Sequence, residues 1–201
     1  MKRWMTIAVL ALMLGGCNWL YDMGSNNEAT DPAFDISEAG LTVPDFEYVN
    51  QEGDPFGTEQ LKGNYWLVNM IFTHCPGVCN IMTPNMVNLQ DAMIEEGLDV
   101  KVVSFTVDPD RDTPELLKVY GENVGADFEY WSFVTGYSDG EITELAKTAF
   151  ASIVQEDPEN EDIIHTTDFF LVDDQGLVIR RYDGMATDQA EIINDLKATV
   201  E

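Results

Sequence analysis

The chain has 201 residues, 45% of them hydrophobic, which suits one folded domain with a buried core and a short extension. It carries 37 acidic and 10 basic residues, for a formal net charge of −27. This charge argues against nucleic acid or an anionic membrane surface as a partner, because both bind through basic patches.

The first sixteen residues are expected to be a signal peptide. Lys2 and Arg3 form a positive start, and the apolar run 7–14 is too short to span a bilayer as a helix. Leu14 to Cys17 read LGGC and resemble the lipobox of bacterial lipoproteins, in which the cysteine becomes the lipidated N-terminus. The alternative is an ordinary secretory signal with a chance cysteine.

With a lipid on Cys17, residues 17–41 would be a flexible tether and 42–201 the folded domain, on the extracytoplasmic side of a bacterial cell membrane. The chain has three cysteines, so lipidation leaves Cys75 and Cys79 as a pair with no odd thiol. Outside the cytosol this pair can form a disulfide. We therefore expect a thiol reductant among the partners.

Apolar periodicity and turn residues predict the elements of the domain in chain order. They are a hairpin at 46–50 and 55–57, a polar connection at 59–63, a strand at 65–72, a helix at 82–93 ending near Gly97, a strand at 100–107, a helix from Pro114 to 124 capped by Thr113, a strand at 128–135, a helix from Ser138 to 154, an acidic loop at 155–162, a hairpin at 168–172 and 177–182, and a last helix opened by Asp188.

This order predicts an α/β fold with a central mixed sheet and helices on both faces. A cysteine pair directly after the first central strand is typical of a thioredoxin-like fold. The hairpin that precedes that strand would be an N-terminal addition to it.

Residues 72–80 read FTHCPGVCN and place Cys75 and Cys79 where a strand passes into a helix. A helix N-terminus favours the thiolate, which is both the nucleophile and the metal ligand. Residues four apart share a helix face, so the two sulfurs can close a disulfide or converge on one ion. A purely structural staple is the alternative, although so short a ring stabilises little.

Two histidines are available as a third ligand. His74 adjoins Cys75 at a strand end and is expected to point to the opposite face. His165 precedes the C-terminal hairpin and can approach both sulfurs in a thioredoxin-like fold; a surface or capping role is the alternative. Two thiolates and one imidazole favour copper, with zinc as the competitor. Asp108 could complete the set but is more simply a turn residue.

Three stretches, FTHCPGVCN, DPDRDTP and HTTDFFLVDDQG, occur in the order and spacing of the Sco/SenC family, and the resemblance spans most of residues 42–200. It implies a thioredoxin-like fold that binds one copper ion and helps assemble the CuA centre of cytochrome c oxidase subunit II. It also implies copper ligands at Cys75, Cys79 and His165, with Asp108 in a supporting role. Asn80 departs from the proline usual there, but we expect the helix to form.

Three functions follow from these residues. The first is a copper chaperone, which is not an enzyme. The second is a thiol–disulfide oxidoreductase whose Cys75/Cys79 pair reduces the cysteines of the CuA site through a mixed disulfide. The third is a peroxiredoxin-like peroxidase, since that branch shares the fold and a similar DP-x-RDTP stretch.

Overall fold

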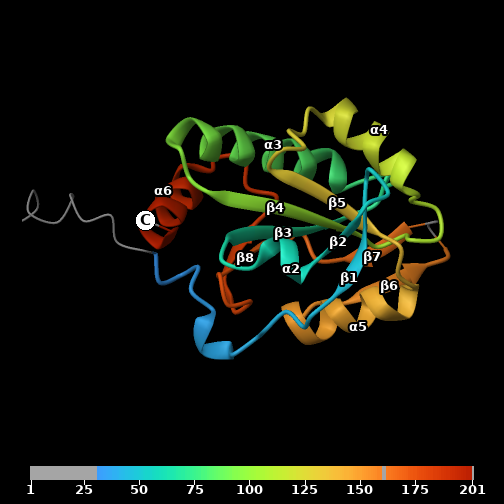
Figure 1. Cartoon of the computed structure of the whole chain (residues 1–201), viewed down its shortest axis with the longest axis horizontal. Coiled ribbons are helices and arrows are strands. Elements are labelled where there is room, and N and C mark those ends of the chain that lie inside the picture. Colours follow the sequence, from blue (N-terminus) through green and yellow to red (C-terminus); the bar gives the residue numbers. More distant parts are fainter. Residues whose placement is uncertain (1–30, 160–161, 201) are drawn as a thin grey trace, which may run out of the picture.

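The computed structural model describes residues 31–159 and 162–200 (Figure 1). Its centre is a seven-stranded sheet in the order β2-β1-β5-β4-β3-β8-β9. The strands are β1 Glu47–Asn50, β2 Pro55–Gly57, β3 Tyr65–Ile71, β4 Val100–Thr106, β5 Trp131–Thr135, β8 Asp168–Val172 and β9 Val178–Asp183. β3, β4 and β5 run parallel, whereas the β1–β2 and β8–β9 hairpins are antiparallel to their neighbours. The predicted mixed, thioredoxin-like sheet with an added N-terminal hairpin is confirmed.

Helices cover both faces of the sheet, as Figure 1 shows with α3 and α4 above it and α5 below. They are α2 Thr58–Leu61, α3 Cys79–Glu96, α4 Pro114–Val124, α5 Asp139–Phe150 and α6 Ala190–Val200, with a 3₁₀ turn η1 Ser37–Ala39. Alternate side chains of β3 divide between two cores: Leu67 and Ile71 pack with α3, and Val68 and Met70 pack with α5.

The predicted helix ends are confirmed where a local signal specifies them. The Thr113 hydroxyl accepts a hydrogen bond from the Leu116 N–H, and proline follows as the first residue of α4. Ser138 and Glu141 form the capping box of α5. Gly97 ends α3 at a φ of 74°, a left-handed conformation that glycine adopts without strain.

The strand predicted at 128–135 and the helix predicted to end at 154 are shorter in the structure. β5 begins at Trp131 rather than residue 128, because the preceding residues turn and the Gln90 side chain bonds both the N–H and the C=O of Asp127. α5 ends at Phe150 rather than 154, because Ala151 takes a left-handed φ of 48°. The polar connection at 59–63 instead contains the single turn α2, where the Gln60 side chain accepts from the Gly57 N–H.

The predicted acidic loop at 155–162 is wrong: most of its described residues belong to a two-stranded hairpin, β6 Val154–Asp157 and β7 Asp162–His165. Val154 and Ile163 pack against the core on the α5 side, and this packing stabilises the two strands. The sequence did not predict them because most of the residues between Val154 and Ile163 are charged. The last residue of this hairpin is His165, directly opposite Val154 in the register.

The folded part begins before the predicted boundary at residue 42. The Ile36 N–H donates to the Ile179 carbonyl, and the Leu41 carbonyl accepts from the Val178 N–H, so this part of the expected tether lies along β9. The predicted signal peptide and Cys17 lie outside the described residues. Within the two described ranges, no helix is both long and apolar enough to cross a membrane.

Candidate functional site

The two cysteines lie at the carboxyl end of β3. Cys75 closes a turn in which its N–H donates to the Phe72 carbonyl at 3.3 Å. Cys79 is the first residue of α3 and is 4% exposed, whereas Cys75 is half-buried. The helix thus begins at the second cysteine, earlier than predicted. Asn80 occupies its first turn, and Val78 at the cap position makes no side-chain capping bond.

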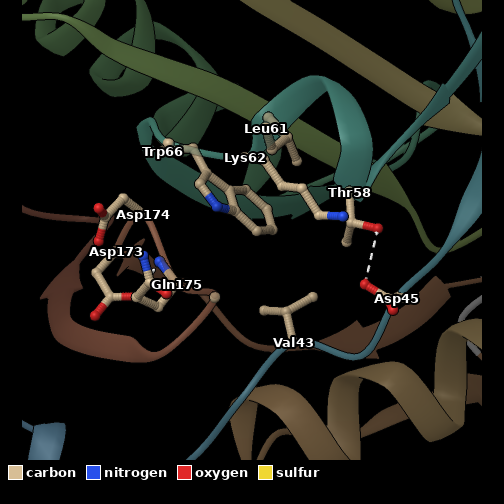
Figure 2. Close-up of a pocket in the computed structure, with 11 residues that line it drawn as sticks. Val43, Asp45, Thr58, Leu61, Lys62, Trp66, Asp173, Asp174 and Gln175 are labelled. Atoms are coloured by element: carbon tan, nitrogen blue, oxygen red, sulfur yellow. Dashed lines mark hydrogen bonds between the residues drawn. The ribbon is translucent and has the colours of Figure 1, made fainter.

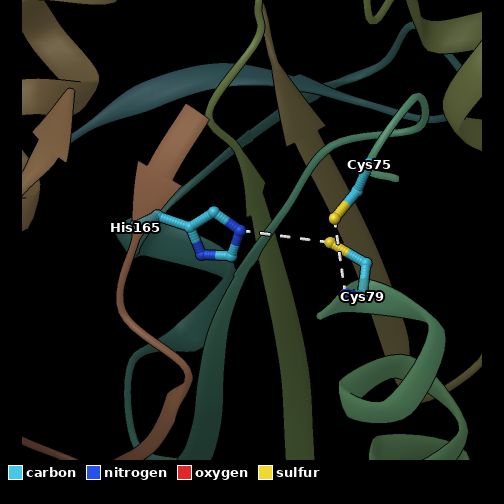
Figure 3. Close-up of side chains that lie close together, drawn as sticks. All are labelled: Cys75, Cys79 and His165. Carbon is cyan, nitrogen blue, oxygen red and sulfur yellow. Dashed lines mark hydrogen bonds between the residues drawn. The ribbon is translucent and has the colours of Figure 1, made fainter. Parts of the chain in front are cut away.

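His165 approaches this pair from another segment of the chain, at the end of β7 (Figure 3). Its Nε2 lies 4.0 Å from the Cys79 sulfur, and the three possible ligand atoms of Cys75, Cys79 and His165 lie within 4.8 Å of one another. The structure therefore brings together the three side chains that the sequence singled out.

The orientation of the His165 ring is fixed by two contacts. Its Nδ1 lies 2.7 Å from the Thr166 carbonyl oxygen. Because a carbonyl oxygen can only accept, Nδ1 carries the proton, and the lone pair of the neutral ring is left on Nε2, facing the sulfurs. The Phe72 ring meets the imidazole edge to face, with ring centroids 5.9 Å apart.

The two thiols have opposite electrostatic environments. A hydrogen bond from the Cys79 thiol, with help from the Cys79 backbone N–H, lowers the pKa of Cys75 to about 4. The backbone N–H at the start of α3 lies 3.4 Å from the Cys75 sulfur. The hydrogen bond to Cys75 and burial raise the pKa of Cys79. Of the two thiols, Cys75 is therefore the one that ionises more readily.

The donor set is chemically soft. Two sulfurs and one imidazole nitrogen match copper or zinc, and not the oxygen-seeking cations. Among residues 31–159 and 162–200, this is the one cluster of three His, Cys, Asp or Glu side chains arranged closely enough to hold an ion. A structural zinc site would normally have a fourth protein ligand, which this cluster does not supply.

The other candidates lie apart from the cluster. His74 is exposed, and its Nδ1 contacts the Thr73 hydroxyl at 2.9 Å. Asp108 pairs with Arg111 at 3.7 Å, its carbonyl accepts from the N–H groups of Arg111 and Asp112, and burial raises its pKa. Asp108 is thus a turn residue near the site rather than a member of the group of three.

Sequence reasoning missed Asp112, which is fully buried two residues before α4. Its carboxylate accepts hydrogen bonds from the Thr73 N–H at 3.0 Å, the Thr73 hydroxyl at 2.5 Å and the Thr106 hydroxyl at 2.5 Å. The available signal is the third aspartate of DPDRDTP, the stretch between the predicted strand at 100–107 and the predicted helix from Pro114.

A separate cavity of about 320 Å³ lies at the opposite end of β3 (Figure 2). Trp66, Lys62 and three aspartates, Asp45, Asp173 and Asp174, are among the residues that line it. A strand rises about 3.3 Å per residue, so β3 places this cavity roughly 20 Å from the thiols. It contributes nothing to their chemistry.

Comparison with known proteins gives consistent matches. A sequence profile described as SCO1/SenC matches residues 35–201. The SCO1 protein homolog of Bacillus subtilis (strain 168) is 42% identical over 158 residues, covering 78% of this chain and 81% of that protein. The crystal structure of a SCO1/SenC family lipoprotein from Bacillus anthracis str. Ames gives a TM-score of 0.76 at 43% identity, covering 81% of this chain and 96% of that one.

Two further solved structures bear on the chemistry. BsSco, described as having a disulfide switch and as a member of the Sco family of cytochrome c oxidase assembly proteins, is 38% identical with a TM-score of 0.73, over 81% of this chain and 96% of its own. Bradyrhizobium japonicum ScoI, solved with copper bound, is 26% identical with a TM-score of 0.66, over 78% of this chain and 98% of its own.

Proposed function

The chain belongs to the SCO1/SenC family, and from that membership we propose that it is a copper chaperone that helps assemble the CuA centre of cytochrome c oxidase subunit II. The observation that carries the proposal is the meeting of Cys75, Cys79 and His165 within 4.8 Å. A related structure holds copper, and another is described as an oxidase assembly protein.

Each of the three side chains would have a different role in binding and releasing copper. Cys79 is buried at the start of α3 and is the fixed sulfur. Cys75 is the more exposed sulfur, so a cysteine of the partner would replace it first in a ligand exchange. The imidazole of His165 would supply the third bond, with its Nε2 lone pair already directed at the thiols.

We further propose that residues 1–16 are a signal peptide and that a lipid on Cys17 tethers the domain to the outer face of the bacterial cell membrane. The support is the LGGC sequence behind a short apolar run, together with the relative described as a lipoprotein. This location would present the site to the part of the oxidase outside the cytosol.

A thiol–disulfide oxidoreductase is the second candidate, favoured by the low pKa of Cys75. In this reaction the Cys75 thiolate attacks a disulfide of the partner and forms a mixed disulfide, releasing one partner thiolate. The Cys79 thiol then gives its proton to the released partner thiolate and attacks the Cys75 sulfur, which frees the second partner sulfur as a thiolate and leaves a Cys75–Cys79 disulfide. A thiol reductant would restore the starting dithiol.

The test of copper binding uses the two histidines as a matched pair. The reduced protein is titrated with Cu(I) against a competing chelator, comparing wild type, His165→Ala and His74→Ala. Changing a residue that merely orients a ligand costs about 10- to 100-fold in metal affinity, so loss of the His165 ligand should cost at least that much. His74 lies outside the cluster, and its variant should bind as wild type does.

The same variants separate the two functions in cells. Unchanged affinity in His165→Ala would remove this histidine from the site and contradict the chaperone proposal in its present form. If His165→Ala still supports oxidase assembly while Cys79→Ser accumulates a mixed disulfide with subunit II, reduction is the principal reaction.

A further inference from the structure

We propose that Asp112 is the positioning residue of the thiol pair: its buried carboxylate holds the turn that carries Cys75. The carboxylate is 0% exposed and touches neither sulfur nor imidazole in the contacts described above. All three of its hydrogen bonds go instead to threonines, two of them to Thr73 and one to Thr106.

Thr73 lies where the chain leaves β3 and enters the turn that carries Cys75. The backbone ladder between β3 and β4 ends where the Val107 N–H bonds the Ile71 carbonyl. The turn from Phe72 to Cys75 follows at once, and Thr73 is its second residue. Since Asp112 accepts from both the N–H and the hydroxyl of Thr73, the start of the turn is fixed from the β4 side.

The same turn sets the position of both kinds of ligand. Its last residue is Cys75, whose sulfur must lie near Cys79 for any shared chemistry. Its first residue is Phe72, which is buried and packs edge to face on the His165 ring. Loss of the hydrogen bonds that hold Thr73 would therefore displace Cys75, and it would also weaken the contact between the Phe72 ring and the His165 imidazole.

Two substitutions perturb this arrangement to different degrees. Asp112→Ala removes the carboxylate that accepts from three buried or half-buried donors, which is costly to the fold. Thr73→Val removes the contacts of the Thr73 hydroxyl with Asp112 and with the exposed His74, but it keeps the Thr73 N–H bond to Asp112, so it is the milder change. Asp195→Asn is the matched control, because Asp195 is also a buried carboxylate with three partners, on α6.

The first measurement does not depend on copper. The equilibrium between the Cys75–Cys79 disulfide and glutathione reports the effective concentration of one thiol at the other. In the Asp112→Ala protein we expect the equilibrium constant for forming the Cys75–Cys79 disulfide to fall by about tenfold, equivalent to about 30 mV in the two-electron potential. Thr73→Val should shift it in the same direction by less, and Asp195→Asn should leave it unchanged.

The second measurement rests on the proposed copper chaperone function. Asp112→Ala should lower Cu(I) affinity by about 10- to 100-fold, in the range found for residues that orient a metal ligand. If wild type itself does not bind Cu(I), the proposed function fails, while the disulfide equilibrium still tests the role of Asp112.

Folded Asp112→Ala and Thr73→Val proteins with a wild-type disulfide equilibrium would overturn the proposal and leave Asp112 a purely structural residue. If Asp112→Ala does not fold, Thr73→Val decides alone. A shift as large in Asp195→Asn would also overturn it, since general destabilisation would then account for the effect.

Discussion

The low pKa of Cys75 leads to a direct prediction about thiol reactivity. Iodoacetamide should modify Cys75 in the reduced, metal-free protein at a nearly constant rate from about pH 6 to pH 8. The reason is that a thiol with a pKa of about 4 is almost fully thiolate throughout this range. Cys79, which is 4% exposed and has a raised pKa, should stay unmodified.

The size of the effect decides which observable to use. An ordinary thiol with a pKa of about 8.5 is roughly 0.3% thiolate at pH 6, so Cys75 gains about 300-fold in thiolate there. Its intrinsic nucleophilicity falls with pKa, at a Brønsted slope of about 0.4–0.5, which removes about 100-fold. The absolute rate at pH 6 is then only about threefold higher, so the slope with pH, not the rate, is diagnostic.

The control removes the largest contributor to the low pKa. In Cys79→Ala the thiol that donates to the Cys75 sulfur is gone, so the pKa of Cys75 rises and its alkylation should accelerate with pH. Mass spectrometry of the modified peptides after timed quenching gives both rates. A wild-type rate that climbs about tenfold per pH unit between pH 6 and 8, as for an ordinary thiol, would refute the reasoning.

Two stability predictions have internal controls. Asp195→Asn should lower the free energy of unfolding by about 1.5–3 kcal/mol, because the buried Arg180 guanidinium on β9 loses one of its two carboxylate partners and keeps only Asp35. Lys118→Ala breaks the exposed ion pair with Glu52 and should lower the free energy of unfolding by less than about 1 kcal/mol. Equal urea midpoints for the Asp195→Asn and Lys118→Ala proteins would contradict the stabilising role of the buried pair. Gly57→Ala should destabilise by about 1–3 kcal/mol, since its Cβ would lie 2.1 Å from the Phe46 carbonyl oxygen. Gly140→Ala meets nothing closer than 3.9 Å and should be neutral or stabilising; a loss as large as that of Gly57→Ala would refute the steric account.

Local signals in the sequence were sufficient for the central elements. The apolar run of β3, the Thr113 cap and the Ser138 capping box each act through contacts only a few residues apart. Prediction failed where distant packing overrides local composition. The β6–β7 hairpin reads as an acidic loop, and it is stabilised by Val154 and Ile163 resting on a core built elsewhere in the chain.

The candidate site divides in the same way. Cys75 and Cys79 could be identified from their spacing and their place before a helix, and His165 from the shortage of other soft ligands. The role of Asp112 could not, because its partner Thr73 lies 39 residues earlier and nothing in DPDRDTP distinguishes a buried carboxylate from its exposed neighbours.

The amino-acid sequence by itself determined the chemistry available to this protein: which soft donors exist, and the four-residue spacing that puts the Cys79 thiol beside Cys75 where a strand passes into a helix. The tertiary structure alone decided that the imidazole reaches the thiols and that a buried aspartate holds their turn. Both outcomes require segments dozens of residues apart to pack together, and such contacts depend on the burial of the whole core rather than on any short stretch of sequence.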